Sequence, residues 1–332
     1  MRGTVLLHPR AQRGRTASDV GGQNIEPKFW LTATHVPDSA SGTPVAWRLS
    51  TDFPNDLFDI FASLYRIDPG FTPMLGFVRR TGILETTGHL DFMPRPHVLG
   101  IRQLVLEVVP TWDIIANEQG SLSRVRDWQT ASFDWVALGG FLESGDLFGI
   151  HVQRFFDAPT AAFPIFRSTN IAPGRYWWTR GQVLYTLSPG RALSASAVLS
   201  WGGFYDGHST EEDLTITWRH GGHLLLGANM SRSRVSLSGG QFTALQTGGR
   251  IEYALNTRMD FLGFAQFDNE TARVDFDLRF HWIPVIGDDF FVVWNSGYTT
   301  DPQAQFRFPD RGALSRPLSG SFIVKLVHRL AP

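Results

Sequence analysis

The sequence predicts an all-β protein, an antiparallel up-and-down transmembrane β-barrel of about 16 strands that is incomplete at its N-terminal side. Three observations support this prediction: apolar and polar residues alternate from residue 28 to the end, the alternating segments are long, and the connections between them fall into two length classes. Helical periodicity is almost absent. Residues 1–27 are expected to be a residual N-terminal segment, and 28–332 the barrel domain.

The clearest strand covers residues 272–282. Its apolar side chains point to one face and its ionic side chains to the other, because successive residues of a strand alternate between faces. The apolar set is Ala272, Val274, Phe276, Leu278, Phe280 and Trp282, and the ionic set is Arg273, Asp275, Asp277, Arg279 and His281.

Clusters of Gly, Pro, Asn and Asp separate about sixteen such segments. We expect strands near 28–36, 44–52, 57–67, 83–93, 101–116, 121–142, 147–156, 175–187, 191–202, 210–219, 223–236, 247–256, 258–267, 272–282, 289–298 and 319–330. Many of these segments are longer than the strands of soluble sandwiches, which usually have about 5 or 6 residues, and they match the roughly 9 to 11 residues that cross a bilayer at a tilt. Their length therefore favours a membrane barrel.

The connections point the same way, because outer-membrane barrels have short turns at one rim and longer loops at the other. Counting back from the C-terminus, alternate connections are expected to be long, with a tight turn at 268–271 as the exception. The expected long connections are 299–318, 237–246, 203–209 and 157–174.

The composition excludes several classes of function. With 30 Lys and Arg against 31 Asp and Glu, the formal charge of -1 gives no reason to expect a nucleic-acid partner. The absence of cysteine excludes disulfides, thiol catalysis and cysteine-ligated metals. No apolar run approaches the roughly 18 residues of a membrane-spanning helix, and the N-terminus has no signal-peptide pattern. The chain is therefore either not exported or part of a longer, exported protein.

The loop 68–80 is the most distinctive segment, because two prolines and two glycines precede a pair of arginines. We expect it to fold into the lumen, with Phe71 and Phe77 packed and the arginines paired with carboxylates; the alternative is a contact with a ligand or partner. The residues of this ligand-or-lumen loop are Phe71, Pro73, Gly76, Phe77, Arg79 and Arg80.

The ionic stripe of Arg273, Asp275, Asp277 and Arg279 admits two interpretations. Two carboxylates about 7 Å apart on one strand face resemble a glycosidase pair. Alternating charges are more typical of a neutralised lumen wall, however, since each acid has an arginine two residues away. We therefore expect a lumen wall and no catalytic residue.

No other pattern indicates chemistry. His220 and His223 flank a Gly-Gly turn and lack a third metal ligand nearby, so we expect no metal and no cofactor. Catalytic motifs are absent. Aromatic residues near strand ends are expected to form membrane-interface girdles rather than sugar-stacking platforms. They are Trp112, Trp128, Trp177, Trp178, Trp201, Trp282, Trp294, Tyr176 and Tyr298.

Four segments resemble the domain of unknown function family 5916. They are 69–80 (Pro-Gly-Phe-x-Pro-x-x-Gly-Phe-Val-Arg-Arg), 264–269 (Phe-Ala-Gln-Phe-Asp-Asn), 278–282 (Leu-Arg-Phe-His-Trp) and 289–295 (Asp-Phe-Phe-Val-Val-Trp-Asn). The resemblance covers roughly residues 28–330, with Trp294 where tyrosine is commoner. It implies an outer-membrane barrel of Gram-negative bacteria, preceded in full-length members by a signal peptide and a family 9 type carbohydrate-binding module. It supplies no catalytic residues.

Our leading hypothesis is an outer-membrane β-barrel, the C-terminal portion of a longer protein, that serves as a passive passage for polar solutes or as an anchor. Its expected partners are the bilayer and polar solutes or glycans. One alternative is part of a surface glycan-binding or glycan-processing protein, and a second is a soluble β-rich glycosidase that uses Asp275 and Asp277.

Overall fold

A computed structural model of the chain describes residues 28–35, 44–72, 77–167, 169–300 and 317–328. Within these ranges the protein is all-β, apart from one short 3-10 helix, η1 (Val125–Asp127). No helix among the described residues has the length and apolar character needed to cross a membrane.

Sixteen strands form one antiparallel sheet in up-and-down order, as the sequence predicts. Neighbours in the sheet are neighbours in the chain, except that β7 pairs with β10 around a separate two-stranded hairpin, β8–β9. The strands of the first half are β1 (Lys28–His35), β2 (Val45–Pro54), β3 (Phe58–Ile67), β4 (Ile83–Phe92), β5 (Ile101–Asn117), β6 (Trp128–Leu142), β7 (Leu147–Asp157), β8 (Phe163–Phe166) and β9 (Thr169–Ile171). Those of the second half are β10 (Tyr176–Thr186), β11 (Leu193–Phe204), β12 (Gly207–His220), β13 (Leu224–Leu237), β14 (Gly240–Asn256), β15 (Met259–Asp268), β16 (Arg273–Trp282), β17 (Asp288–Thr299) and β18 (Pro317–His328).

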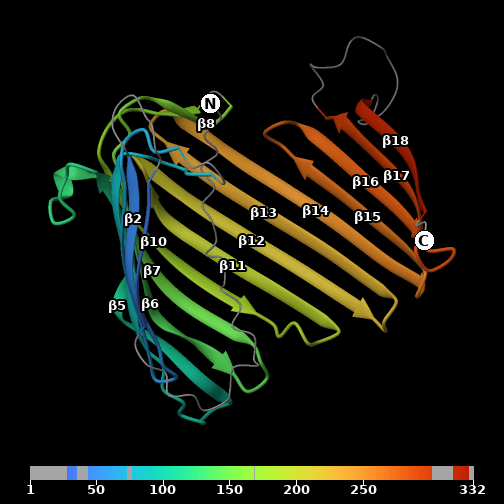
Figure 1. The fold of residues 1–332 in the computed structure, drawn as a ribbon, viewed down its shortest axis with the longest axis horizontal. Coiled ribbons are helices and arrows are strands. Elements are labelled where there is room, and N and C mark those ends of the chain that lie inside the picture. Colours follow the sequence, from blue (N-terminus) through green and yellow to red (C-terminus); the bar gives the residue numbers. More distant parts are fainter. Residues whose placement is uncertain (1–27, 36–43, 73–76, 168, 301–316, 329–332) are drawn as a thin grey trace.

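The sheet is strongly curved and open (Figure 1). The strands β2 to β7 form one wall, and β11 to β18 run diagonally away from it. Among the described residues, β1 and β18 are the two edge strands, and no pairing joins them. The barrel-type sheet predicted from the sequence is therefore present as an open curve.

The prediction of long connections at 203–209 and 237–246 is wrong. The strands β11 to β14 continue through these segments and are joined by two-residue turns, at 205–206 and 238–239. These strands run to 17 residues because ladder pairing does not require a strict apolar alternation: the ends 207–210 and 240–246, which mix polar residues with Phe242 and Leu245, are paired with their neighbours. The connections 68–82, 118–127 and 158–175 are long and lie at the same edge, which we call the long-loop rim. We call the opposite edge the short-turn rim.

Register gives the sheet two chemically distinct faces, because directly opposed residues of adjacent strands share a face. On one face Ser50 opposes Ser63, which opposes Thr87, which opposes Asp113. We call this the polar face. The other, apolar face presents large side chains that remain exposed. Among them are Leu49, Ile60, Ile150, Val152, Val183, Leu199, Trp201, Ile216, Leu226, Ile251, Phe322, Val324 and Leu326.

The hairpin β8–β9 was not predicted. It lies in the connection between β7 and β10, and its aromatic residues pack on the polar face against strands as far away as β14. Arg167, which lies in the turn between β8 and β9, donates a hydrogen bond of 2.6 Å to the main-chain oxygen of Asn269. Because the shortest path across a curved sheet runs over its concave side, a connection that reaches from β7 to this turn indicates that the polar face is the concave one.

The close approach of β12 to β13 leaves no room for a side chain at Gly207. A Cβ atom there would collide with the main-chain oxygen of Ser236, whereas at Gly222, in the turn after β12, it would meet open space. We predict that Gly207→Ala lowers the free energy of unfolding by about 1 to 3 kcal/mol, the usual cost of an overpacked site. Urea titration of the refolded protein measures this change. Gly222→Ala is the matched control, and equal midpoints for the two variants would contradict the predicted close contact.

Candidate passage along the polar face

The loop 68–82 is fixed to the sheet at its first residue. The carboxylate of Asp68 accepts hydrogen bonds from the main-chain N–H of Val45 and from Nε of Arg66, each at 3.0 Å. The hydrogen bond from Val45, followed by the guanidinium of Arg66, holds the pKa of the Asp68 carboxyl below its usual value against the opposing effect of desolvation. The loop therefore leaves β3 from a defined point at the long-loop rim.

The loop then packs back onto the polar face, as predicted for a loop that enters the lumen. Phe71 is buried together with Ala46, Ile67 and Ile83, which oppose one another on β2, β3 and β4. Val78 packs against the same cluster.

Phe77 does not follow the prediction. Its side chain is 86% exposed, whereas Phe71 and Val78 are packed against the polar face. Pro73 and Gly76 lie outside the described residues.

The paired arginines are held beside a charged part of the polar face. Glu85 on β4 lies within electrostatic range of Asp113, Arg48, Arg80 and Arg79. Arg80 also interacts electrostatically with Asp113 and donates a hydrogen bond of 3.0 Å to Oε1 of Gln129, at the start of β6. We call Arg48, Arg79, Arg80, Glu85 and Asp113 the rim cluster. It places three guanidinium groups against two carboxylates on the concave side of the sheet.

A second insert, the segment 158–175 with its hairpin, is held by an aromatic cluster on the polar face. Tyr205 is at its centre: its ring lies 4.7 Å from that of Trp178 and 5.2 Å from that of Tyr176, and its hydroxyl donates to Asp157 at 2.6 Å. Burial and this hydrogen bond raise the pKa of the Tyr205 hydroxyl. The prediction that Trp178 and Tyr176 belong to an outer girdle is therefore wrong, because register turns them toward the polar face.

Exposed aromatics do occur on the apolar face, near both rims. Those near the long-loop rim are Trp177 and Trp201, and those near the short-turn rim are Tyr185, Trp218, Tyr253 and Trp282. Of the nine residues predicted for girdles, Trp177, Trp201 and Trp282 are in this set, and their place at a membrane interface stays a prediction.

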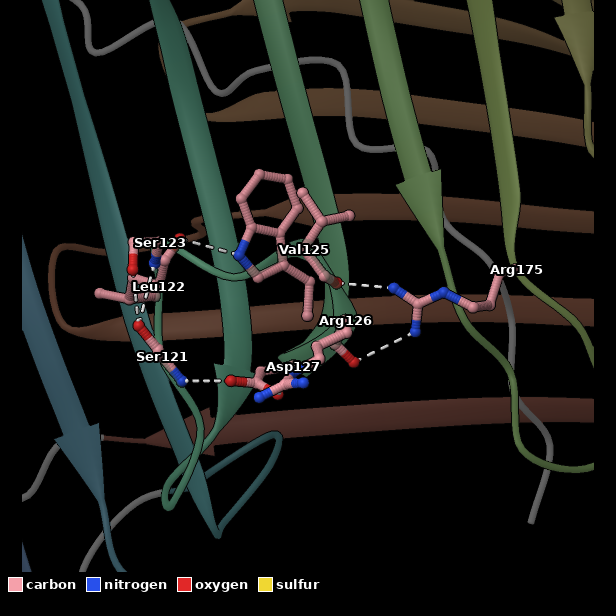
Figure 2. Close-up of polar contacts among 8 residues, drawn as sticks. Ser121, Leu122, Ser123, Val125, Arg126, Asp127 and Arg175 are labelled. Carbon is pink, nitrogen blue, oxygen red and sulfur yellow. Dashed lines mark hydrogen bonds and ion pairs between the residues drawn. The ribbon is translucent and has the colours of Figure 1, made fainter.

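The inserts of the long-loop rim are tied to one another (Figure 2). Arg175, at the end of the segment 158–175, donates to the main-chain oxygens of Val125 and Arg126 at 2.6 and 3.2 Å. The connection that carries η1 is itself closed by the hydrogen bonds from Ser121 N to Asp127 and from Trp128 Nε1 to Leu122. Since Arg80 reaches Gln129 just beyond η1, the three long connections form one linked layer at this rim.

The predicted ionic stripe lies on the polar face of β16, as its alternation indicates. Arg273 pairs with Asp275 at 2.8 Å, which agrees with the mutual neutralisation expected of a lumen wall. Asp277 opposes Asn295 and Phe264 in the ladder, and Arg279 opposes Val293 and Leu262. The glycosidase interpretation of Asp275 and Asp277 stays a prediction.

Three potential metal ligands come together elsewhere among the described residues. The ligand atoms of Asp59, His89 and Asp91 lie within 4.8 Å of one another on the polar face near the short-turn rim. One imidazole and two carboxylates suit a divalent cation. Sequence analysis missed this group, because His89 and Asp91 share a face of β4 by simple alternation, while Asp59 joins them only through the register of β3. The predicted histidine pair is separate: His223 Nδ1 lies 2.9 Å from the main-chain oxygen of Ala254.

No protein-family model matches the chain, and no curated protein matches it. Among solved structures, it is similar to Pseudomonas aeruginosa OccK11 (OpdR), at 14% sequence identity and a TM-score of 0.39, over 84% of this chain and 79% of that chain.

The anchor at Asp68 predicts a pH response of the loop. A carboxyl whose pKa is lowered in the folded state stabilises it above the unfolded pKa, and this contribution is lost as the pH falls through the lowered value. We therefore expect the loop to loosen below about pH 4. Because the chain has no cysteine, a spin label at Phe77→Cys reports loop mobility specifically.

The Asp68→Asn change should raise the mobility of this label already at pH 7 and remove the acid response. A label at Gly222→Cys, in a turn of the short-turn rim, is the control for general acid effects. A label at Phe77→Cys that is equally mobile at pH 7 and pH 2.5 in the wild-type background would contradict the role of Asp68.

Proposed function

We propose that this protein is an outer-membrane β-barrel that lets polar solutes pass without catalysis, with the polar face lining the water-filled path. The observation that carries this proposal is the separation of the two faces: one face exposes large apolar side chains over most of the sheet, and the other holds most of the charges and both inserts. A soluble protein rarely exposes so broad an apolar surface, whereas lipid covers the outside of a membrane barrel.

The linked layer at the long-loop rim supports a role in selectivity. Inserts that pack on the concave side narrow any path along the polar face, and the rim cluster places charge at that narrowing. Charged groups that line a pore select solutes by the sign of the solute's charge. Three arginines against two carboxylates favour the passage of anions over cations.

In this proposal the long-loop rim faces outward from the cell and the short-turn rim faces the periplasm, as in outer-membrane barrels generally. The membership in the family 5916 predicted from the sequence, and with it a carbohydrate-binding module upstream, is a further proposal. It concerns what the barrel displays and leaves the passage unchanged.

Planar-bilayer recording of the refolded chain tests the passage. We expect discrete conductance steps after insertion, because charged and polar side chains lie on the polar face near both rims and between them. If flotation with vesicles shows that the protein inserts and no conductance occurs at any voltage, the passage is excluded and the anchor role remains.

Charge substitution tests the rim cluster. The double variant Arg79→Gln/Arg80→Gln should shift the ratio of anion to cation permeability toward cations by about twofold or more, since it leaves Glu85 and Asp113 facing Arg48 alone. The reversal potential in a KCl gradient measures this ratio. Arg126→Gln, an exposed arginine in η1, is the matched control. Identical reversal potentials for the double variant and the control would show that the cluster does not line the path.

A further inference from the structure

The apolar face carries a hollow of about 460 Å³ across β10, β11 and β12. Its wall is formed by Val183, Tyr185, Ala197, Val198, Leu199, Trp201, Glu212, Asp213 and Leu214. This volume lies in the range of pockets that bind small ligands.

Register explains the hollow. Ala197 on β11 lies between Tyr185 on β10 and Leu214 on β12, so that a methyl group is flanked by two large side chains. Trp201 lies four residues beyond Ala197 on β11, toward the long-loop rim. Its side chain is 44% exposed and forms that end of the hollow. A depression of this kind, with an alanine floor and aromatic and aliphatic walls, accommodates a hydrocarbon chain.

A charged group adjoins the same hollow. Glu212 belongs to its wall and forms an ion pair with Arg232, directly opposite on β13, and a second, at 3.8 Å, with Arg234. Two guanidinium groups against one carboxylate leave an excess positive charge. The guanidinium group of Arg234 is the more accessible of the two, because its side chain is 57% exposed and its contact with Glu212 is the longer one.

Such a group is unusual on this face, because charged side chains in the lipid-facing band of a barrel are destabilising near its centre and tolerated near the interface. Glu212 and Arg232 lie just beyond the middle of β12 and β13, on the side of the long-loop rim, and Arg234 lies two residues further toward that rim, opposite Thr210. Thr210 in turn opposes Trp201. Arg234 is therefore level with the aromatic residues near the long-loop rim, where lipid headgroups begin if the apolar band lies in the bilayer.

We propose that the hollow and the arginine pair together bind an anionic lipid, with an acyl chain over Ala197 and the headgroup phosphate at Arg232 and Arg234. The apolar hollow alone would accept the chain of any lipid. The guanidinium groups make the site selective, since arginine binds phosphate oxygens through paired, charge-assisted hydrogen bonds. This inference rests on the proposed location in a membrane.

Native mass spectrometry of the refolded full chain in detergent tests the site. The probes are dioleoylphosphatidylglycerol and dioleoylphosphatidylcholine, which share their acyl chains and differ in headgroup charge. We expect retention of the anionic lipid over the zwitterionic one by about threefold or more, the scale of an exposed ion-pair contact.

Substitutions separate the two parts of the site. Arg234→Gln should bring the headgroup preference close to one, whereas Glu212→Gln should increase it, because it removes the carboxylate that competes for the arginines. Ala197→Trp should fill the hollow and reduce retention of both lipids. Ala228→Trp is the matched control, since Ala228 is an exposed alanine on the same face, opposite Ile216 and away from the hollow.

Equal retention of the two lipids by the wild type, or unchanged retention in Ala197→Trp, would overturn the inference. Displacement of the lipid by millimolar inorganic phosphate would also overturn it, since this would identify a site for free phosphate rather than for a lipid. If the chain conducts in bilayers but shows no preference for the anionic lipid, only the lipid site is contradicted. If the chain does not insert into vesicles, the proposed function is contradicted as well.

Discussion

The structure depends on one constraint: in an antiparallel sheet every interior strand satisfies its main-chain N–H and C=O groups with its two neighbours, and each edge strand does so on one side, whatever their side chains are. Sixteen strands of this protein are joined in that way, in chain order. The side chains are then free to divide between two faces with opposite chemistry, because the pleat alternates them strictly. The ends of β12, β13 and β14 at the long-loop rim show the same principle, since they remain paired where polar residues interrupt the apolar alternation.

The concave face gains its specific character from segments that are not part of the sheet. The loop after β3 is anchored by Asp68 and packed through Phe71 and Val78, and the hairpin β8–β9 is held by the aromatic cluster around Tyr205. Hydrogen bonds from Arg80 and Arg175 join these inserts through the start of β6 and η1. Packing and hydrogen bonding therefore determine where the rim cluster places its charges, and a loop attached only at its ends would not hold them there.

The convex face is largely apolar, and Glu212, Arg232 and Arg234 form an ionic group on it. A uniformly apolar surface interacts with any hydrocarbon, so that distinction between lipids requires a local departure from it. The small side chain of Ala197 and the charges of Arg232 and Arg234 provide such a departure side by side, on three adjacent strands.

The sequence by itself determined the fold class, the number of strands in the sheet and the division of each strand between two faces. These follow from period-2 alternation, which is local, as in residues 272–282 with Arg273 and Asp275 on one side. Local patterns could not determine the ends of β11 to β14, because polar residues pair without leaving an apolar signal. The tertiary structure alone decided the contacts that depend on register or on folding back: Asp59 with His89, Trp178 with Tyr205, Arg80 beside Glu85, and Glu212 with Arg232. Each of these contacts depends on the register between strands or on the point at which a loop returns to the sheet. Neither can be read from the spacing of residues along a single strand, because that spacing describes one strand at a time.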